Sequence, residues 1–296
     1  MRLLATPSFC CLLLAVAVGA AGAAEPVLPD TVLARVDGTD ITRVEVERLV
    51  ASSPITGVDL ATPAGKRVLR ELTTALIQRQ LLEREAVESG LADDPTYQKA
   101  IADFEKGVAK DANREAMVAE YRRTKLVTLQ RARLRERWQS SEAEARAYFE
   151  AHRPHFDVPE EVNVQQIVVA DATAAERVAK EARGGADFSG LAVRHSTDPY
   201  VKRNFGMLGW VKRGEGFAEL DKVIFSLKEK QAIGGPVQSP RGFHVVKLID
   251  HRDGRQVSFD EARNKVEEAM VKERLNAHLL ELAKQAKIIV NKAAFQ

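Results

Sequence analysis

The pattern of apolar and polar positions predicts strands at both ends of residues 162–250, and capping signals predict helices between them. One side of the opening strand carries Val162, Val164, Gln166 and Val168. The intervening residues fall on the other side, a period of two that is typical of a half-buried strand. The closing segment Phe243–Ile249 is rich in β-branched residues, which favour strands.

Helix signals lie between these two strands. Thr173 with Glu176 has the spacing of a capping box, and Asp187 can cap a second helix. Glycine and proline at residues 234–236 indicate a turn. We therefore expect residues 160–251 to form one small α+β domain.

The region before this domain begins with a hairpin signal and a helix cap. Asp37-Gly38 is a hairpin-type turn sequence between short apolar stretches. Thr42 with Glu45 has the spacing of a capping box, which predicts a helix immediately afterwards.

Two longer helices are expected next. Apolar residues of Lys66–Ser89 recur at helical spacing, and Gly90 can end this helix. Pro95 can open the following helix, which we expect to run through Tyr121 to Trp138.

A long amphipathic helix is expected at the C-terminal end. Ser258 with Glu261 makes a capping box, and an apolar stripe follows. One helix cannot bury such a stripe alone, so we expect residues 255–296 to pack against residues 25–157. The 160–251 domain would then be inserted into a discontinuous, mostly helical domain. A homodimer seam is a competing use of the same stripe.

Residues 1–24 have the pattern of a secretory signal peptide. Arg2 precedes a short apolar run that ends in small residues at Ala23 and Ala24. The run is short for a membrane span. We expect cleavage after one of these alanines and a periplasmic location.

Cysteine and histidine usage argues against metal and thiol chemistry. Cys10 and Cys11 are the only cysteines, and both lie in the predicted signal peptide. The mature chain is therefore expected to have no disulfide, thiolate metal site or cysteine nucleophile. His152 and His155 flank Pro154, which breaks the helical register, so we expect a surface loop there rather than a metal site.

The charge pattern gives little reason to expect a nucleic acid or membrane partner. The formal charge of +2 falls to +1 when the predicted signal peptide, with its single arginine, is removed. The segment 122–137 is rich in arginine and could contact anionic lipid or acidic client segments. A solvated helix face is the interpretation we favour.

Several segments between Val162 and Asp250 occur in a distinctive order. They are QIVVA, ADFSGLA, HSTDP, LGW, FAELDKVIFSL, GGPV and GFHVVKLID. This order resembles the parvulin type of peptidyl-prolyl cis-trans isomerase, and the flanking regions resemble the helical chaperone regions of SurA- and PrsA-like foldases. The resemblance implies a small antiparallel sheet with surrounding helices. It also implies isomerisation of Xaa-Pro bonds in unfolded or partly folded exported polypeptides, without a cofactor.

The resemblance assigns candidate site residues. A polar environment at the isomerising amide would come from Asp198, His244, Ser239 and Gln166. An apolar proline pocket would come from Leu208, Gly216, Phe217, Leu220 and Phe225.

Three of these positions differ from the usual family pattern. Gln166 replaces a histidine, Gly216 a methionine and Leu220 a phenylalanine. Glutamine can donate and accept hydrogen bonds but cannot reproduce two coupled imidazoles, and thinner apolar walls weaken proline binding. Phe217 can refill part of the space. The alternative hypothesis is therefore a non-catalytic chaperone, a periplasmic holdase with a degenerate parvulin domain.

Overall fold

Two compact units make up the described chain. The residues described by the computed structural model are 28–29, 31–52 and 58–295. The predicted signal peptide lies outside them. The second unit is Ala143–Val266, and the first consists of the described residues on either side of it. Across the described ranges, none of the helices is both long and apolar enough to cross a lipid bilayer.

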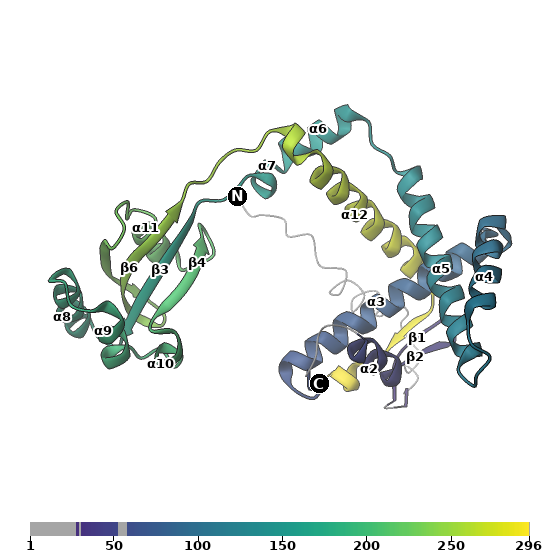
Figure 1. Cartoon of the computed structure of the whole chain (residues 1–296), viewed down its shortest axis with the longest axis horizontal. Coiled ribbons are helices and arrows are strands. Elements are labelled where there is room, and N and C mark those ends of the chain that lie inside the picture. Colours follow the sequence, from purple (N-terminus) through teal and green to yellow (C-terminus); the bar gives the residue numbers. More distant parts are fainter. Residues whose placement is uncertain (1–27, 30, 53–57, 296) are drawn as a thin grey trace, which may run out of the picture. The chain divides into compact units, whose positions relative to one another are not determined.

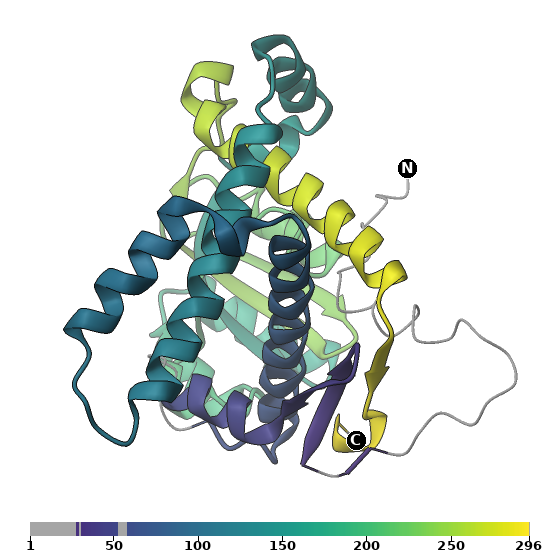
Figure 2. The same cartoon turned by 90° about the vertical axis from the view of Figure 1, so that its right-hand side faces the viewer.

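The first unit is mainly helical, with a small sheet (Figure 2). Its elements before the second unit are β1 (Val32–Val36), β2 (Thr39–Thr42), α2 (Arg43–Ala51), α3 (Pro63–Glu88), η1 (Leu91–Asp93), α4 (Pro95–Gly107) and α5 (Arg114–Arg137). Its elements after the second unit are the C-terminal part of α12 (Phe259–Gln285), β7 (Ile288–Val290) and η2 (Lys292–Phe295).

The predicted hairpin and first helix cap are both confirmed. Asp37 and Gly38 have positive φ angles of 49° and 90° and connect β1 to β2. Two successive positive φ angles match the twist of a tight hairpin, which explains the Asp-Gly sequence. The Thr42 side chain accepts from the Glu45 backbone N–H, and the Glu45 carboxylate accepts from Thr42 in return.

A third strand, which the sequence did not predict, completes the first sheet. The strand order is β2-β1-β7, so the C-terminal strand pairs with β1. Ala34 lies opposite Val290, and Val36 lies opposite Ile288. The end of the chain therefore contributes hydrogen bonds to the hairpin near its start.

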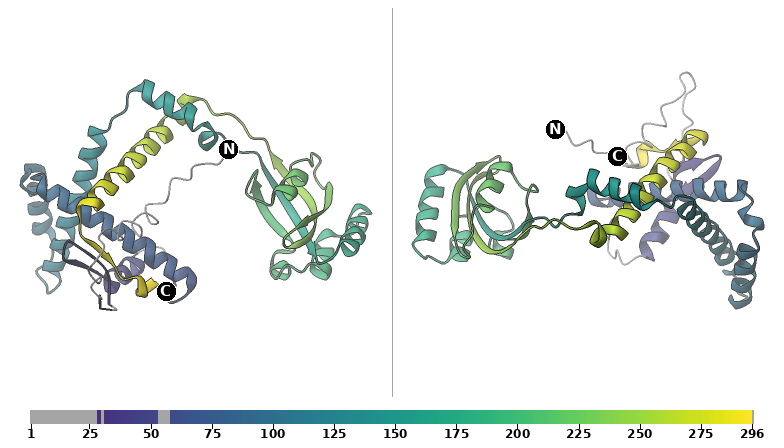
Figure 3. Two further views of the ribbon diagram at one scale, coloured as in Figure 1. Left: turned by 180° about the vertical axis from the view of Figure 1, so that it is seen from behind. Right: turned by 90° about the horizontal axis from the view of Figure 1, so that it is seen from above.

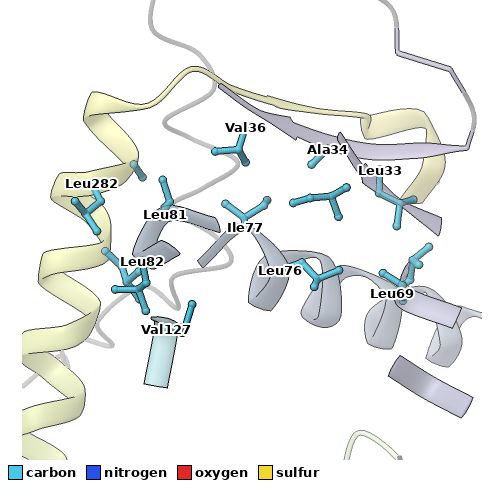
Figure 4. Packing of buried hydrophobic residues seen from close by; sticks show 14 of the residues in the cluster. Leu33, Ala34, Val36, Leu69, Leu76, Ile77, Leu81, Leu82, Val127 and Leu282 are labelled. Carbon is cyan, nitrogen blue, oxygen red and sulfur yellow. The ribbon is translucent and has the colours of Figure 1, made fainter. Parts of the chain in front are cut away.

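The core of the first unit joins residues from both ends of the sequence. Figure 4 shows α3 side chains between those of β1 and α12. Leu81 and Leu33 are fully buried there, as is nearly all of Leu279 on α12. The C-terminal half of the predicted apolar stripe is thus covered within this chain.

The single helix predicted from Pro95 to Trp138 is wrong. The chain forms two helices, α4 and α5, separated by residues 108–113. The Arg114 guanidinium donates to carbonyl oxygens of Val108 and Glu105, and the Phe104 and Tyr121 rings stack 3.9 Å apart. These tertiary contacts favour a bend over continuous helix, and local spacing does not reveal them.

The second unit is an antiparallel sheet with helices on both faces (Figures 1 and 3). Its strands are β3 (Glu161–Val169), β4 (Met207–Lys212), β5 (Ile233–Ser239) and β6 (Gly242–Arg252), in the order β4-β3-β6-β5. Its helices are α6 (Glu142–Ala151), α7 (Arg153–Phe156), α8 (Ala172–Arg183), α9 (Phe188–His195), α10 (Val201–Asn204), α11 (Ala218–Ile224) and the start of α12.

The prediction of a half-buried opening strand is also wrong, because both faces of β3 are covered. Val162 and Val164 pack with Leu220 and Ile224 of α11 on one face. Ile167 and its neighbours on the other face pack against α8 and α9. Because the strand is central and sandwiched by helices, six consecutive residues from Val164 onward are buried.

One of the two predicted helix caps in this unit is wrong. Asp171, rather than Thr173, caps α8 by accepting from the Ala174 backbone N–H at 2.8 Å. Aspartate is at least as good an N-cap as threonine, so the helix starts earlier. The predicted cap Asp187 is confirmed on α9, where it accepts from the backbone of Ser189 and Gly190.

The two segments that enter and leave the sheet are joined to each other. The Val257 backbone N–H donates to Asp157 at 2.9 Å, and Val158 pairs with Arg255 in a short antiparallel bridge. Next to them, the Phe149 ring meets the Phe259 ring edge-on, with centroids 5.8 Å apart. The second unit therefore includes α6, α7 and the first turns of α12.

Candidate active site

A chain of hydrogen bonds links three of the predicted polar residues. His244 on β6 lies opposite Val168 of β3 and Val237 of β5 in the sheet register. Its Nδ1 is 3.0 Å from Gln166 Oε1, and its Nε2 is 2.6 Å from Ser239 Oγ. The sheet brings together residues that are up to 78 positions apart in sequence.

The chemistry of these partners determines where the imidazole proton lies. A glutamine amide oxygen only accepts, so His244 Nδ1 carries the proton and donates to Gln166. In the neutral ring Nε2 is then an acceptor, and the Ser239 hydroxyl donates to it. The Arg241 backbone N–H in turn donates to Ser239 Oγ at 3.0 Å.

Burial keeps this histidine neutral. Only 2% of the His244 surface is exposed. Burial lowers the pKa of His244 below its ordinary value, because the charged ring loses hydration, and the positive charge of Arg241 lowers that pKa further. At neutral pH the site therefore contains a neutral, oriented imidazole rather than a cation.

Phe217 forms an aromatic wall beside this histidine. It is the residue immediately before α11, and its ring lies edge-on to His244, with centroids 6.4 Å apart and planes at 60°. It is 37% exposed, so a ligand can reach its ring.

The loop before Phe217 is held by a buried carboxylate. Asp221 is 8% exposed, and its Oδ2 accepts from the Gly214 backbone N–H at 2.7 Å. A Cβ atom at Gly216 would lie 2.6 Å from Asp221 Oδ1. Glycine, in place of the family's methionine, therefore leaves room for the Asp221 carboxylate.

Asp198 lies on a loop whose two ends are attached to β3. We call Thr197–Gly206 the flap. At its start, Thr197 N–H donates to the Val168 carbonyl at 2.7 Å, and at its end the Gly206 carbonyl accepts from Gln166 N–H at 2.8 Å. The flap thus runs beside the strand that carries Gln166, with Asp198 near one end of it.

The remaining predicted pocket residues differ in exposure. Leu208 on β4 is 42% exposed. Leu220 of α11 and Phe225, which directly follows α11, are buried between that helix and the sheet. The Arg213 guanidinium lies 4.3 Å from the Phe225 ring centre. The structure therefore groups Gln166, His244, Ser239 and Phe217 through direct contacts. Direct contact with proline by Leu220 and Phe225 stays a prediction.

Gly206 and Asp221 were missed in the sequence analysis. Gly206 has φ +80°, and a Cβ atom there would lie 2.4 Å from the Gln166 carbonyl oxygen. A glycine between an asparagine-bearing turn and a strand is a recognisable signal for such close approach. Asp221 could have been noticed as a carboxylate next to apolar positions of a short helix.

Comparison with known proteins identifies the family of the second unit. A family model described as the PPIC-type PPIase domain matches residues 140–264, which include the whole sheet and the site. The chain carries a parvulin-type peptidyl-prolyl isomerase domain. We call Ala143–Val266 the parvulin unit.

Relatives extend beyond the parvulin unit. A putative peptidyl-prolyl cis-trans isomerase of Helicobacter pylori strain J99 is 25% identical over 273 residues, covering 88% of this chain and 86% of that protein. The foldase protein PrsA of Halalkalibacterium halodurans is 31% identical over 134 residues, 45% of this chain and 38% of that protein. A SurA-like chaperone structure from Campylobacter jejuni covers 86% of this chain and 96% of its own, with 22% identity and a TM-score of 0.42.

The parvulin unit offers hydrogen-bonding groups and an exposed apolar wall at one site. The Ser239 hydroxyl is engaged with His244, and the imidazole is engaged at both nitrogens. Among the residues that the structure describes, no three His, Cys, Asp or Glu side chains are grouped to hold a metal ion. Neutral hydrogen-bonding groups beside an aromatic ring suit the isomerisation of a bound peptide amide.

Proposed function

We propose that this protein is a peptidyl-prolyl cis-trans isomerase that assists the folding of exported polypeptides outside the cytoplasm, in the periplasm. The observation that carries the proposal is the Ser239–His244–Gln166 chain beside Phe217, within a PPIC-type domain. The signal-peptide pattern of residues 1–24 supports export. Relatives named isomerase or foldase along most of the chain support the folding role.

The reaction requires only that a twisted amide be favoured over a planar one. Rotation about an Xaa-Pro bond crosses a barrier of about 20 kcal/mol, because conjugation between nitrogen and carbonyl is lost. Interactions accelerate the rotation only if they are stronger in the twisted state. An apolar wall that holds the ring and a donor that meets the altered amide are sufficient.

Gln166 is the donor that we assign to the amide. Its Oε1 faces His244, and its Nε2 has no hydrogen-bond partner among the described residues. This nitrogen is not one of the fully buried polar atoms that lack a partner, so it is partly exposed at the site. The neutral His244 imidazole fixes the Gln166 side chain so that the Gln166 N–H groups face a bound peptide.

The apolar and acidic groups have separate roles in this proposal. Phe217 and Leu208 are the exposed apolar residues against which the proline ring would rest. Asp198, half-buried on the flap, sets the polarity near the rotating amide. Its Oδ1 accepts from the Tyr200 backbone N–H, which holds the carboxylate in place.

A protease-coupled assay with Xaa-Pro peptides tests the function. The full chain should accelerate isomerisation above the spontaneous rate. Asp198→Ala and Ser239→Ala should each lower kcat/KM by about tenfold, the effect of one lost hydrogen bond or polar contact. Ser226→Ala is the matched control, since Ser226 bonds only to the Val223 carbonyl at the end of α11. No acceleration by the wild-type chain would leave only the holdase hypothesis.

A further inference from the structure

The flap and the start of β4 expose an unusual amount of apolar surface. Tyr200 is 63% exposed and Phe205 is 53% exposed, the two highest values among the exposed large apolar residues that the structure describes. Next along the chain, Met207 and Leu208 are 37% and 42% exposed. Aromatic side chains exposed together in this way indicate a binding surface rather than a core.

The conformation of Phe205 is specifically held. Its φ is 53°, in the left-handed region, which costs a non-glycine residue about 1–2 kcal/mol. The Gln165 side chain donates to the Phe205 carbonyl at 3.2 Å. The Asn204 side chain bonds the two residues after Phe205, accepting from Gly206 N–H and donating to the Met207 carbonyl. The ring is thus presented to solvent by a fixed backbone.

The same turn carries unpaired positive charge. Lys202 and Arg203 lie within α10, between the two aromatic residues, and both are exposed. In the described part of the chain, neither has a carboxylate within ion-pair distance, although many other basic residues do. An acidic ligand group would complement them.

The flap is continuous with the candidate active site. Asp198 precedes Tyr200 by two residues, and Gly206, which follows Phe205, bonds to the backbone of Gln166. A peptide with its proline beside Phe217 and Gln166 would therefore extend along the flap.

We propose that the flap selects client segments with a large apolar side chain next to the proline and an acidic residue close by. Tyr200 and Phe205 cover the apolar side chain, and Lys202 and Arg203 attract the acidic one. This inference rests on the proposed function, because it places the peptide's proline in that site.

Peptide binding and turnover together test the selection. Fluorescein-labelled Xaa-Pro peptides are compared with Phe or Ala next to proline, each with Glu or Lys two positions away. The full chain should prefer Phe over Ala by about tenfold in both Kd and kcat/KM, since a buried aromatic ring gains that much or more. Glu should be preferred over Lys by a few-fold, and that preference should vanish at high salt.

Variants of the flap should lose each preference separately. In Tyr200→Ser with Phe205→Ser, the Phe-to-Ala ratio should fall toward 1. In the double variant Lys202→Gln with Arg203→Gln, the Glu-to-Lys ratio should fall toward 1. Met117→Gln removes an apolar residue of the first unit that is 49% exposed, close to the 53% of Phe205, and should keep both ratios.

The two readouts separate the two proposals. Turnover without any preference, or preferences unchanged in the flap variants, would overturn the selection by the flap while the isomerase assignment stands. Selective binding without turnover would overturn the isomerase assignment while the flap keeps its role. If the chain shows no peptide binding and no turnover, both proposals are overturned.

Discussion

At the residue scale, the decisive feature is a neutral histidine with a partner on each nitrogen. Ser239 and Gln166 are both neutral, so neither compensates a charge on His244. In many sites a histidine acts by gaining and losing a proton. Here the arrangement favours a fixed protonation state that orients Gln166.

The lowered pKa of His244 makes stability depend on pH. Below the ordinary histidine pKa the unfolded chain binds a proton that the folded ring resists, so the unfolded state binds more protons. Stability of the parvulin unit should therefore be highest above that pKa and fall as the pH is lowered through it. Urea unfolding of the full chain between pH 7.5 and 5 measures the slope. His244→Gln should flatten it; equal slopes in both proteins would contradict this account.

Gln166→Glu separates the two ends of the glutamine side chain. A carboxylate still accepts the proton of His244 Nδ1, but it offers no N–H to the substrate. We expect kcat/KM to fall about tenfold or more while the fold is kept. The negative charge should also raise the pKa of His244, which imidazole NMR titration would detect. Full activity in this variant would show that the substrate does not use the Gln166 donor.

At the scale of elements, the flap depends on one close approach of backbone to backbone. Gly206 lets its loop reach β3, and the resulting bond to Gln166 N–H holds the end of the flap. The hydrogen bonds of Ser196 Oγ with Val168 N–H and Asp198 N–H hold the other end. Both ends of the flap are therefore attached to β3.

Gly206→Ala should break this attachment. Its Cβ would meet the Gln166 carbonyl oxygen at 2.4 Å, in a backbone conformation that alanine disfavours. We expect a loss of about 2–4 kcal/mol in unfolding free energy, together with reduced activity. Gly185→Ala is the control, because its φ of +90° is similar but its Cβ would meet nothing within 4 Å. It should cost only about 1 kcal/mol. Equal costs would exclude the steric explanation.

At the scale of the whole molecule, each unit has its own core. Leu81 of α3 is fully buried in the first, and Leu191 of α9 is fully buried in the parvulin unit. The sequence crosses between the units twice, yet among the described residues the two core clusters have no member in common.

Separate cores predict separate unfolding transitions. Leu81→Ala and Leu191→Ala should each cost about 2–5 kcal/mol, because each leaves a cavity. In calorimetry of the full chain, each variant should lower one transition and leave the other in place. A single transition lowered equally by both variants would show that the units unfold together.

Local sequence signals predicted the elements well where local physics decides them. The Asp37-Gly38 turn and the Thr42 and Asp187 caps depend on neighbouring residues only. The strand at Phe243–Ile249 was predicted from its β-branched residues, although it also pairs with β3 and β5. The ordered segments between Val162 and Asp250 also predicted the parvulin family, which the family match to residues 140–264 bears out.

The sequence alone determined the elements, the family and the candidate polar groups, because turns, caps and periodicity act over a few residues. Only the tertiary structure decided that β3 is buried on both faces, that β7 joins the first sheet, and that α4 and α5 are separate. It alone determined that His244 is neutral and that Gln166 touches the flap. Those features depend on burial and on contacts between residues far apart in sequence, which no local pattern specifies.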